Sequence, residues 1–403
     1  MSGAETLSLP NVRTVQTRSP FVRLTELLAD LKPGQPPINL TVGEPQHPIP
    51  HFVGKVIQSS LKEFGRYPPT KGNDHFRQAA AQWLNRRFHL PRAVDPENEV
   101  LVVNGTREAL FLAAMTAREL INKRAGPPAI LIPNPFYAAY VAGATAAGCD
   151  PVFLPARRKS GFLPDLDTLE PELLARTVAI FFGSPSNPQG AVADRSYLDR
   201  LLALAHQYDF LIFSDECYSE IYTTDKAPSG MLEAADREFS NVIVFNSLSK
   251  RSNLPGMRVG LTAGDRRFIK KFLDFRNVVA PQVPGPLQEV AAHAFEDEAH
   301  VEENRRLYKL KFDLADQIIG DRYGYARPAG GFFLWLDVSA YGGSEAAALK
   351  LWSEAGVRIL PGGYLAHLQP DGSNPGADFI RVAMVHDQHI TAEALHRIVA
   401  TLQ

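Results

Sequence analysis

The chain has 403 residues, of which 45% are hydrophobic and 21% are charged. These values are typical of a globular protein and exclude a disordered or fibrous chain. Lys and Arg together number 42 against 44 for Asp and Glu, so the net charge is only -2. No strong field of one sign attracts nucleic acid or an anionic membrane, and we expect neither as a partner.

Features that direct a protein into or across a membrane are not recognisable. Only Cys149 and Cys217 are present, which is no disulfide framework and favours a reducing compartment. The first 20 residues lack the apolar core of a signal peptide. No run of about 18 apolar residues occurs. We therefore expect a cytoplasmic protein.

The chain begins with a segment that we interpret as an N-terminal arm, residues 1–37. It contains one apolar helical stretch, residues 21–31, and five prolines interrupt the remainder. Such an arm either packs on its own domain or reaches a partner subunit, and the sequence leaves both possibilities open.

From about residue 98, short apolar runs alternate with helical patterns. Strands are expected at residues 100–103, 129–132, 177–182, 210–214, 242–245 and 259–263. Continuous apolar runs of this length suit a sheet that helices cover on both faces. Between two of the runs, Asp194 can cap a helix that turns Leu198, Leu201, Leu202 and Ala205 to one side. The alternation predicts an α/β fold for the larger domain, residues 38–290.

The pattern changes after residue 281. Residues 286–319 are mostly helical, and strand candidates follow at residues 332–338, 357–360 and 379–385. We therefore expect a smaller α+β domain over residues 291–403. The first part of the larger domain, about residues 38–60, is also compatible with packing on this smaller domain.

A lysine follows directly after one of the predicted strands. Lys250 has Ser247 and Ser249 before it and Arg258 eight residues after it. A lysine at a strand end in an apolar pocket is easily desolvated, which lowers its pKa and makes it a nucleophile for a carbonyl carbon. The hydroxyls and the guanidinium suit a phosphate group. A lone Ser-x-x-Lys is common on surface loops, so this motif needs support from others.

Two further strands end in polar side chains. Asp215 ends one strand, and a buried carboxylate needs a cationic partner such as a protonated pyridine nitrogen. Cys217 lies beside it, and we interpret this thiol as packing because no histidine-paired nucleophile pattern surrounds it. Asn187 follows another strand in Ser-Asn-Pro-Gln-Gly, which is either a simple turn or an amide donor at the carboxyl edge of the sheet.

The segment Asn104-Gly105-Thr106 joins a strand to a helix. Free N–H groups at a helix start favour an anion, and Gly105 permits its close approach. The Lys-Ser/Thr ending of a P-loop is missing, which disfavours a nucleotide triphosphatase.

These segments, taken together and in order, resemble the fold-type I pyridoxal-phosphate enzymes and, within them, the class I/II aminotransferases. The resemblance covers about residues 35–400 and rests on NGTREAL, PNPFYAAY, SPSNPQG, SDECYSEIY, SLSKRSNLPGMRVG and FIRVAM. It implies a mainly parallel central sheet covered by helices, pyridoxal 5'-phosphate as cofactor, no metal, and amino acid and 2-oxo acid substrates. Several segments are most similar to the proteobacterial N-succinyldiaminopimelate aminotransferases of lysine biosynthesis, which implies N-succinyl-L,L-2,6-diaminopimelate and 2-oxoglutarate as the substrate pair.

The resemblance also implies roles for individual residues. Lys250 matches the lysine that binds the cofactor covalently and moves a proton, and Asp215 matches the carboxylate at the pyridine nitrogen. Tyr218 and Asn187 match the groups that bind the ring 3' oxygen, and Tyr137 matches the aromatic residue that stacks on the ring. The residues expected around the phosphate are Gly105, Thr106, Arg107, Ser247 and Arg258.

For the substrate, the resemblance assigns Arg381 to the α-carboxylate, since a planar guanidinium fits two oxygens. The alternative for this arginine, which lies in an apolar strand, is a structural ion pair with a nearby acid. Gly43 and Asn187 are also expected in the substrate pocket. Tyr67 matches a tyrosine that reaches the phosphate of the neighbouring subunit, which implies a homodimer with shared active sites. No motif identifies the residues that bind the distal end of the substrate.

Other functions use similar motifs. A dicarboxylate, aromatic or acyl-ornithine-type aminotransferase, or a pyridoxal-phosphate C–S β-lyase, would share the cofactor segments. A transcription regulator with an aminotransferase-like domain needs a DNA-binding domain of about 70 residues or more. Only about 35 residues precede the family region, so we do not expect such a regulator.

Overall fold

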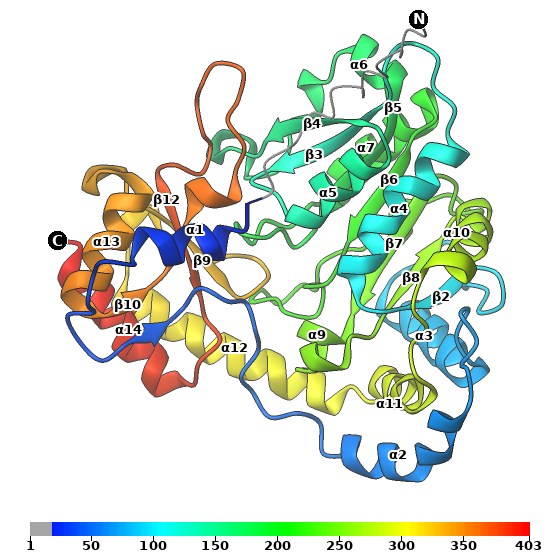
Figure 1. Ribbon diagram of the computed structural model, residues 1–403, viewed down its shortest axis with the longest axis horizontal. Coiled ribbons are helices and arrows are strands. Elements are labelled where there is room, and N and C mark those ends of the chain that lie inside the picture. Colours follow the sequence, from blue (N-terminus) through cyan, green and yellow to red (C-terminus); the bar gives the residue numbers. More distant parts are fainter. Residues whose placement is uncertain (1–17) are drawn as a thin grey trace, which may run out of the picture.

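The computed structural model describes residues 18–403, in which the strands gather in two regions (Figure 1). The strands of the larger region are β2 (Val100–Val103), β3 (Ala129–Asn134), β4 (Asp150–Pro155), β5 (Thr177–Gly183), β6 (Leu211–Asp215), β7 (Val242–Ser247) and β8 (Gly260–Gly264). They form one seven-stranded sheet in the order β2-β8-β7-β6-β5-β3-β4. Strand β8 alone runs in the direction opposite to the other six strands of this sheet, which confirms the predicted mainly parallel sheet.

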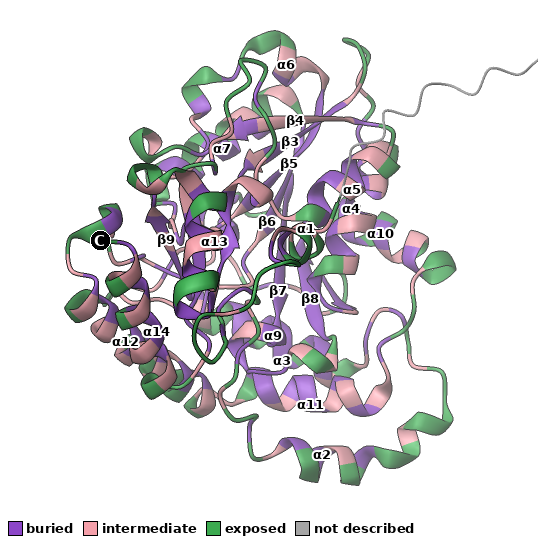
Figure 2. Ribbon diagram, turned by 60° about the vertical axis from the view of Figure 1, so that its left-hand side comes forward, coloured by how far each residue is buried: buried purple, intermediate pink, exposed green. Residues whose placement is uncertain are grey.

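Helices cover both faces of this sheet, as the continuous apolar runs predict (Figure 2). One face carries α4 (Thr106–Leu120), α5 (Ala138–Ala146) and α10 (Arg266–Val279). The other carries α3 (Asp74–Arg87), α7 (Arg195–Tyr208), α8 (Met231–Ala234) and α11 (Gly285–Glu296). Successive strand residues enter opposite cores: Val100 and Val102 face α3, whereas Leu101 and Val103 face α4.

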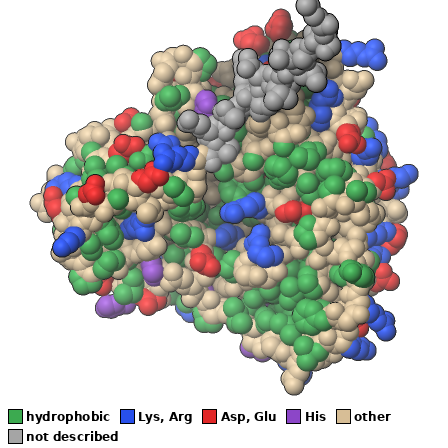
Figure 3. Space-filling view, in the orientation of Figure 1, with side chains coloured by type: hydrophobic (Ala, Val, Ile, Leu, Met, Phe, Trp, Pro, Cys, Tyr) green, Lys and Arg blue, Asp and Glu red, His purple; other side chains and the backbone are tan. Residues whose placement is uncertain are grey.

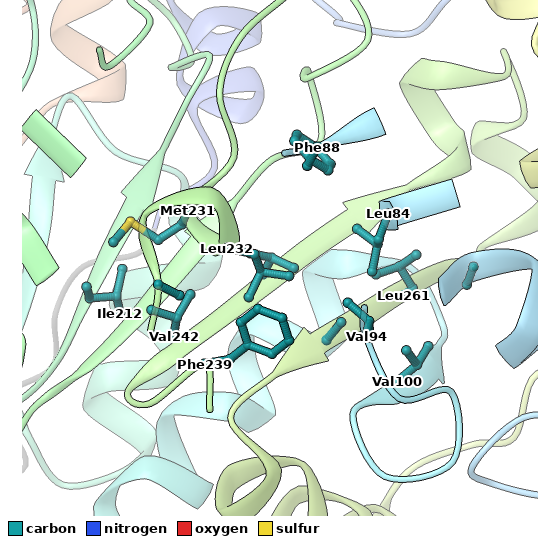
Figure 4. Close-up of a cluster of buried hydrophobic side chains, with 14 of the residues drawn as sticks. Leu84, Phe88, Val94, Val100, Ile212, Met231, Leu232, Phe239, Val242 and Leu261 are labelled. Carbon is teal, nitrogen blue, oxygen red and sulfur yellow. The ribbon is translucent and has the colours of Figure 1, made fainter. Parts of the chain in front are cut away.

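The core on the α3 side is seen at close range in Figure 4. Strand residues Ile212, Val242 and Leu261 belong there to one cluster with Leu84 of α3 and Leu232 of α8, with Leu84 next to Leu261 and Ile212 next to Val242. All five side chains are buried, so they contribute the hydrophobic stabilisation that holds these helices against the sheet.

The predicted helix cap at Asp194 is confirmed. Its carboxylate accepts a hydrogen bond from the main-chain N–H of Tyr197 at 2.8 Å, at the start of α7. Leu198, Leu201 and Ala205 are buried on the side of α7 that faces the sheet.

The smaller region contains two short sheets. Strands β9 (Phe333–Asp337), β11 (Leu360–Pro361) and β12 (Phe379–Ala383) are antiparallel in the order β11-β12-β9, and β1 (Ile38–Asn39) pairs in parallel with β10 (Val357–Arg358). The helices of this region are α12 (Ala299–Ile318), α13 (Gly343–Ala355) and α14 (Gln388–Thr401).

The described part of the N-terminal arm packs on its own chain. Leu24 of helix α1 (Pro20–Leu27) and Leu28, which follows this helix, form a small apolar cluster with Leu360 and Leu365 of the smaller region. Residues 1–17 of the predicted arm lie outside the described residues. Because β1 pairs with β10, residues 20–39 belong with the smaller region by their contacts.

The predicted boundary between residues 290 and 291 falls inside α11. This helix packs on α3 and on α2 (Val53–Ser60) of the larger region, and α12 then leads into the smaller one (Figure 1). The division of the chain at residue 290 stays a prediction. Within residues 18–403, no helix has the length and apolar character needed to cross a membrane.

Candidate active site

The carboxyl ends of the parallel strands border a cavity of about 560 Å³. The molecular face in Figure 3 is hollowed where the two regions meet, and basic side chains gather there. Most of the predicted site residues line the cavity: Gly43, Thr106, Arg107, Tyr137, Asn187, Asp215, Tyr218, Ser247, Lys250 and Arg258. Two others are joined to it by direct contacts, Gly105 with Arg258 and Arg381 with Asn187.

Lys250 lies in α9 (Leu248–Arg251), the short helix that follows β7. Its Nζ donates a hydrogen bond to the main-chain oxygen of Gly43 and lies 5.4 Å from the centre of the Phe332 ring. Burial lowers the pKa of Lys250 from 10.5 to about 8. About a tenth of this amine is therefore neutral near pH 7, far more than for an ordinary lysine, and the neutral form is the one that acts as a nucleophile or a general base.

Asp215 ends β6 and faces the cavity from the strand next to β7. Its Oδ2 accepts a hydrogen bond from the Tyr140 hydroxyl at 2.8 Å, and its Oδ1 accepts one from the main-chain N–H of Cys217 at 3.2 Å. Burial raises the pKa of Asp215. Within residues 18–403, no cationic side chain pairs with this carboxylate. A cationic ligand atom such as a protonated ring nitrogen would supply the missing partner.

The start of α4 forms a cradle for an anion. Gly105 has φ of 72°, and a side chain at this position would collide with the guanidinium of Arg258. Across the cradle, the hydroxyls of Ser247 and Ser249 lie 2.9 Å apart. Main-chain N–H groups at a helix start, two hydroxyls and a guanidinium together match the donors that hold phosphate groups.

Arg381, on β12, is buried and has only neutral partners. Its Nη1 donates to Asn187 Oδ1 at 3.0 Å, and its Nη2 donates to the main-chain oxygen of Thr41 at 2.7 Å. Its Nε is buried without a hydrogen-bond partner, and burial lowers its pKa to about 10. Among the described residues, no carboxylate pairs with this arginine. The alternative of a structural ion pair is therefore not supported, and a ligand carboxylate would complete the site.

The aromatic residues of the site surround the space between Lys250 and α5. Tyr137 precedes α5, and its hydroxyl accepts a hydrogen bond from Arg107 Nε at 2.5 Å. Tyr218 packs edge-on against Phe332 at 5.2 Å, and burial raises its pKa well above 10. The guanidinium of Arg107 is thus engaged by Tyr137, while the start of α4 leaves its main-chain N–H available to an anion.

Tyr67 is the predicted residue that the single chain does not bring to the cavity. Its side chain is 97% exposed and lies among residues of α2 and the segment that follows it. Tyr140 was not among the predicted site residues, although it lies within the segment PNPFYAAY. It follows Tyr137 by three residues, and the two rings are edge-on with their centres 5.6 Å apart. A second tyrosine in the same segment after the strand was the available signal.

Comparison with known proteins provides the decisive observation. A family model described as aminotransferase class I and II matches residues 35–398. The chain belongs to this family. Class I/II aminotransferases depend on pyridoxal phosphate, so the predicted cofactor is confirmed. The residues of this cavity fit that cofactor, since Asp215 has no cationic partner among the described residues and Gly105 leaves room beside Arg258.

Similar aminotransferases cover almost the whole chain. An LL-diaminopimelate aminotransferase from Syntrophobacter fumaroxidans is 29% identical over 94% of this chain and 95% of that protein. The structure of an aminotransferase from Neisseria meningitidis is 38% identical, covers 95% of this chain and 97% of that one, and has a TM-score of 0.89. A probable N-succinyldiaminopimelate aminotransferase from Thermus thermophilus has a TM-score of 0.83 over 95% and 100% of the two chains. It is only 23% identical, which supports the common fold alone.

Proposed function

We propose that this aminotransferase transfers the amino group of N-succinyl-L,L-2,6-diaminopimelate to 2-oxoglutarate. The observation that carries the proposal is Arg381, a buried guanidinium beside the Lys250 cavity with neutral partners and a free Nε. Both substrates have an α-carboxylate that can take this place. The same arginine would therefore orient the donor and the acceptor in the two half-reactions.

Each predicted residue has a distinct task in this proposal. When bound, pyridoxal phosphate supplies a ring that accepts electrons from the carbon bearing the amino group. Lys250 Nζ would hold the cofactor as a nucleophile and, as a neutral amine, would move the proton from the substrate Cα. Asp215 holds a proton at the ring nitrogen. Because Asn187 Oδ1 accepts from Arg381, its Nδ2 is left to donate toward the ring oxygen, together with the Tyr218 hydroxyl.

The space beyond Lys250 suits a long substrate with an acidic end. Phe21, Phe136, Phe162 and Leu163 provide apolar walls, and Arg107 lines the same cavity. The hollow continues into a neighbouring one of about 1120 Å³, which Arg18 and Arg23 help to line. A succinylated chain could lie along the apolar walls while its terminal carboxylate approaches these arginines.

An alternative amino donor is LL-diaminopimelate, which is suggested by the name of a relative, the LL-diaminopimelate aminotransferase of Syntrophobacter fumaroxidans. LL-diaminopimelate lacks the succinyl group, so its distal amino group is a free ammonium. Glu44 lines the cavity and offers a carboxylate for such an ammonium.

A panel of amino donors tests the substrate. We expect kcat/KM with 2-oxoglutarate to be at least about tenfold higher for N-succinyl-L,L-2,6-diaminopimelate than for LL-diaminopimelate, acetylornithine or aspartate. Preference for one of the other donors would disprove the proposed substrate and leave the aminotransferase assignment intact. Release of pyruvate and ammonia from cystathionine would instead support a C–S β-lyase.

We also propose a homodimer in which Tyr67 of each chain completes the active site of the other. Supporting observations are the 97% exposure of Tyr67 and the exposed apolar side chains of Leu61 and Phe64 near it. A Tyr67→Phe variant and a Lys250→Ala variant are each expected to be impaired. After the two variants are mixed in equal amounts and exchange subunits, about a quarter of all active sites should be intact. Half of the dimers are then mixed, and one of the two sites in each mixed dimer is complete. Sedimentation of a fully active monomer would contradict this arrangement.

A further inference from the structure

A cluster of two histidines and a glutamate lies outside the cofactor cavity. His75 is on α3, and His293 and Glu296 are on α11, which packs against α3. One possible ligand atom from each residue lies within 4.8 Å of the other two. We propose that these three side chains bind one divalent transition-metal ion, with Zn²⁺ as the best match. None of them lines the cavity around Lys250, so this site is distinct from the catalytic one.

Each of the two imidazoles has an oxygen acceptor beside its Nδ1. His293 Nδ1 is 2.9 Å from the main-chain oxygen of Glu289, which can only accept a hydrogen bond. His75 Nδ1 is 2.8 Å from the Glu289 carboxylate. Nδ1 of each ring can donate to these oxygens, so Nε2 is the atom that each ring would offer to a metal, and His75 Nε2 already lies 3.1 Å from Glu296 Oε1. Metal-binding histidines are typically held in this way, by an oxygen acceptor at the other ring nitrogen.

The positions on α11 explain why one helix provides so many of these groups. Glu289, His293 and Glu296 follow one another at intervals of four and three residues, so they share the side of the helix that meets His75. The two imidazole rings are edge-on, with centres 5.3 Å apart. Two imidazoles and one carboxylate are a common Zn²⁺ ligand set, and a fourth, tetrahedral position would be open to water.

Without a metal, contacts of His75 with two carboxylates keep these side chains close together. His75 Nε2 is 3.1 Å from Glu296 Oε1 and its Nδ1 is 2.8 Å from Glu289 Oε2, so His75 lies between the two carboxylates. A bound ion would take the place of the direct contact between His75 Nε2 and Glu296. The ion would join α3 to α11 and stabilise the folded chain, because the unfolded chain does not bring these ligands together.

The test uses tag-free holoenzyme that has been treated with EDTA and is titrated with ZnCl₂ against a chromophoric chelator. We expect one Zn²⁺ per chain and an increase in Tm on binding. His293→Ala removes one ligand and leaves both His75–carboxylate pairs in place. It should weaken Zn²⁺ binding at least about tenfold and remove the increase in Tm, while the Tm of the metal-free variant stays near that of wild type.

His206→Ala provides a matched control, because His206 is a similarly exposed histidine beside Asp236, far from this cluster in the sequence. This variant should bind Zn²⁺ as wild type does. Binding by His293→Ala with unchanged affinity would overturn the proposal, as would a wild-type chain that takes up no Zn²⁺. In either case the cluster would be an ion-pair network only.

Discussion

A Lys250→Ala variant is expected to lose at least about 10⁴-fold in kcat for transamination while remaining folded. The substitution removes the amine that we propose as both nucleophile and proton carrier, and no second lysine of residues 18–403 lines the cavity. Steady-state assays with any good amino donor and 2-oxoglutarate measure the loss.

Two controls separate this chemical effect from unfolding. The far-UV circular dichroism and Tm of Lys250→Ala should stay close to those of wild type, since Lys250 Nζ makes its only hydrogen bond with the main-chain oxygen of Gly43 in the described chain. Small primary amines such as methylamine should restore part of the rate, because the shortened side chain leaves room for a soluble base. A variant that retains more than about a tenth of the wild-type kcat would disprove the assigned role.

Arg381→Lys should lower kcat/KM by about 10- to 100-fold for both the amino donor and the 2-oxo acid. Lysine keeps the positive charge but cannot offer the two parallel N–H groups of a guanidinium to a carboxylate. Cofactor affinity, followed by absorbance titration, should change much less.

An amine substrate without an α-carboxylate distinguishes substrate binding from structural support. Arg381 also donates to Asn187 and Thr41, so its loss could disturb the pocket itself. If Arg381 acts on the carboxylate, wild type and Arg381→Lys should process the carboxylate-free amine at similar slow rates. An equal loss for both kinds of substrate would indicate that Arg381 only supports the pocket.

The buried strands of the large sheet were predictable because helices cover both of its faces. Strand β4 was not predicted, since Asp150, Pro151 and Pro155 interrupt its apolar pattern. The antiparallel direction of β8 could not be read from its residues, because local hydrophobicity is the same in either direction. Likewise, the predicted strand over residues 357–360 is divided between β10 and β11, which pair with different sheets.

Site residues that follow a strand directly were the most predictable. Asp215 and Lys250 lie at the ends of neighbouring parallel strands, so their proximity follows from the fold. The contact between Arg381 and Asn187 joins the two regions and depends on how these pack, which no local pattern encodes. The role of Tyr67 stays a prediction from the family resemblance, because its proposed task is in a second copy of the chain.

Borohydride reduction of the holoenzyme, followed by proteolysis and mass spectrometry of the peptides, tests the role of Lys250 most directly. Reduction makes the link between the lysine and the cofactor permanent, so the modified residue can be identified. We predict a pyridoxyl group on Lys250 alone. Lys311 is an informative internal comparison, because burial also lowers its pKa, to about 7, yet its Nζ is bonded to the main-chain oxygen of Met384 away from the cavity. A pyridoxyl group on Lys311, or on any lysine other than Lys250, would contradict the proposed active site.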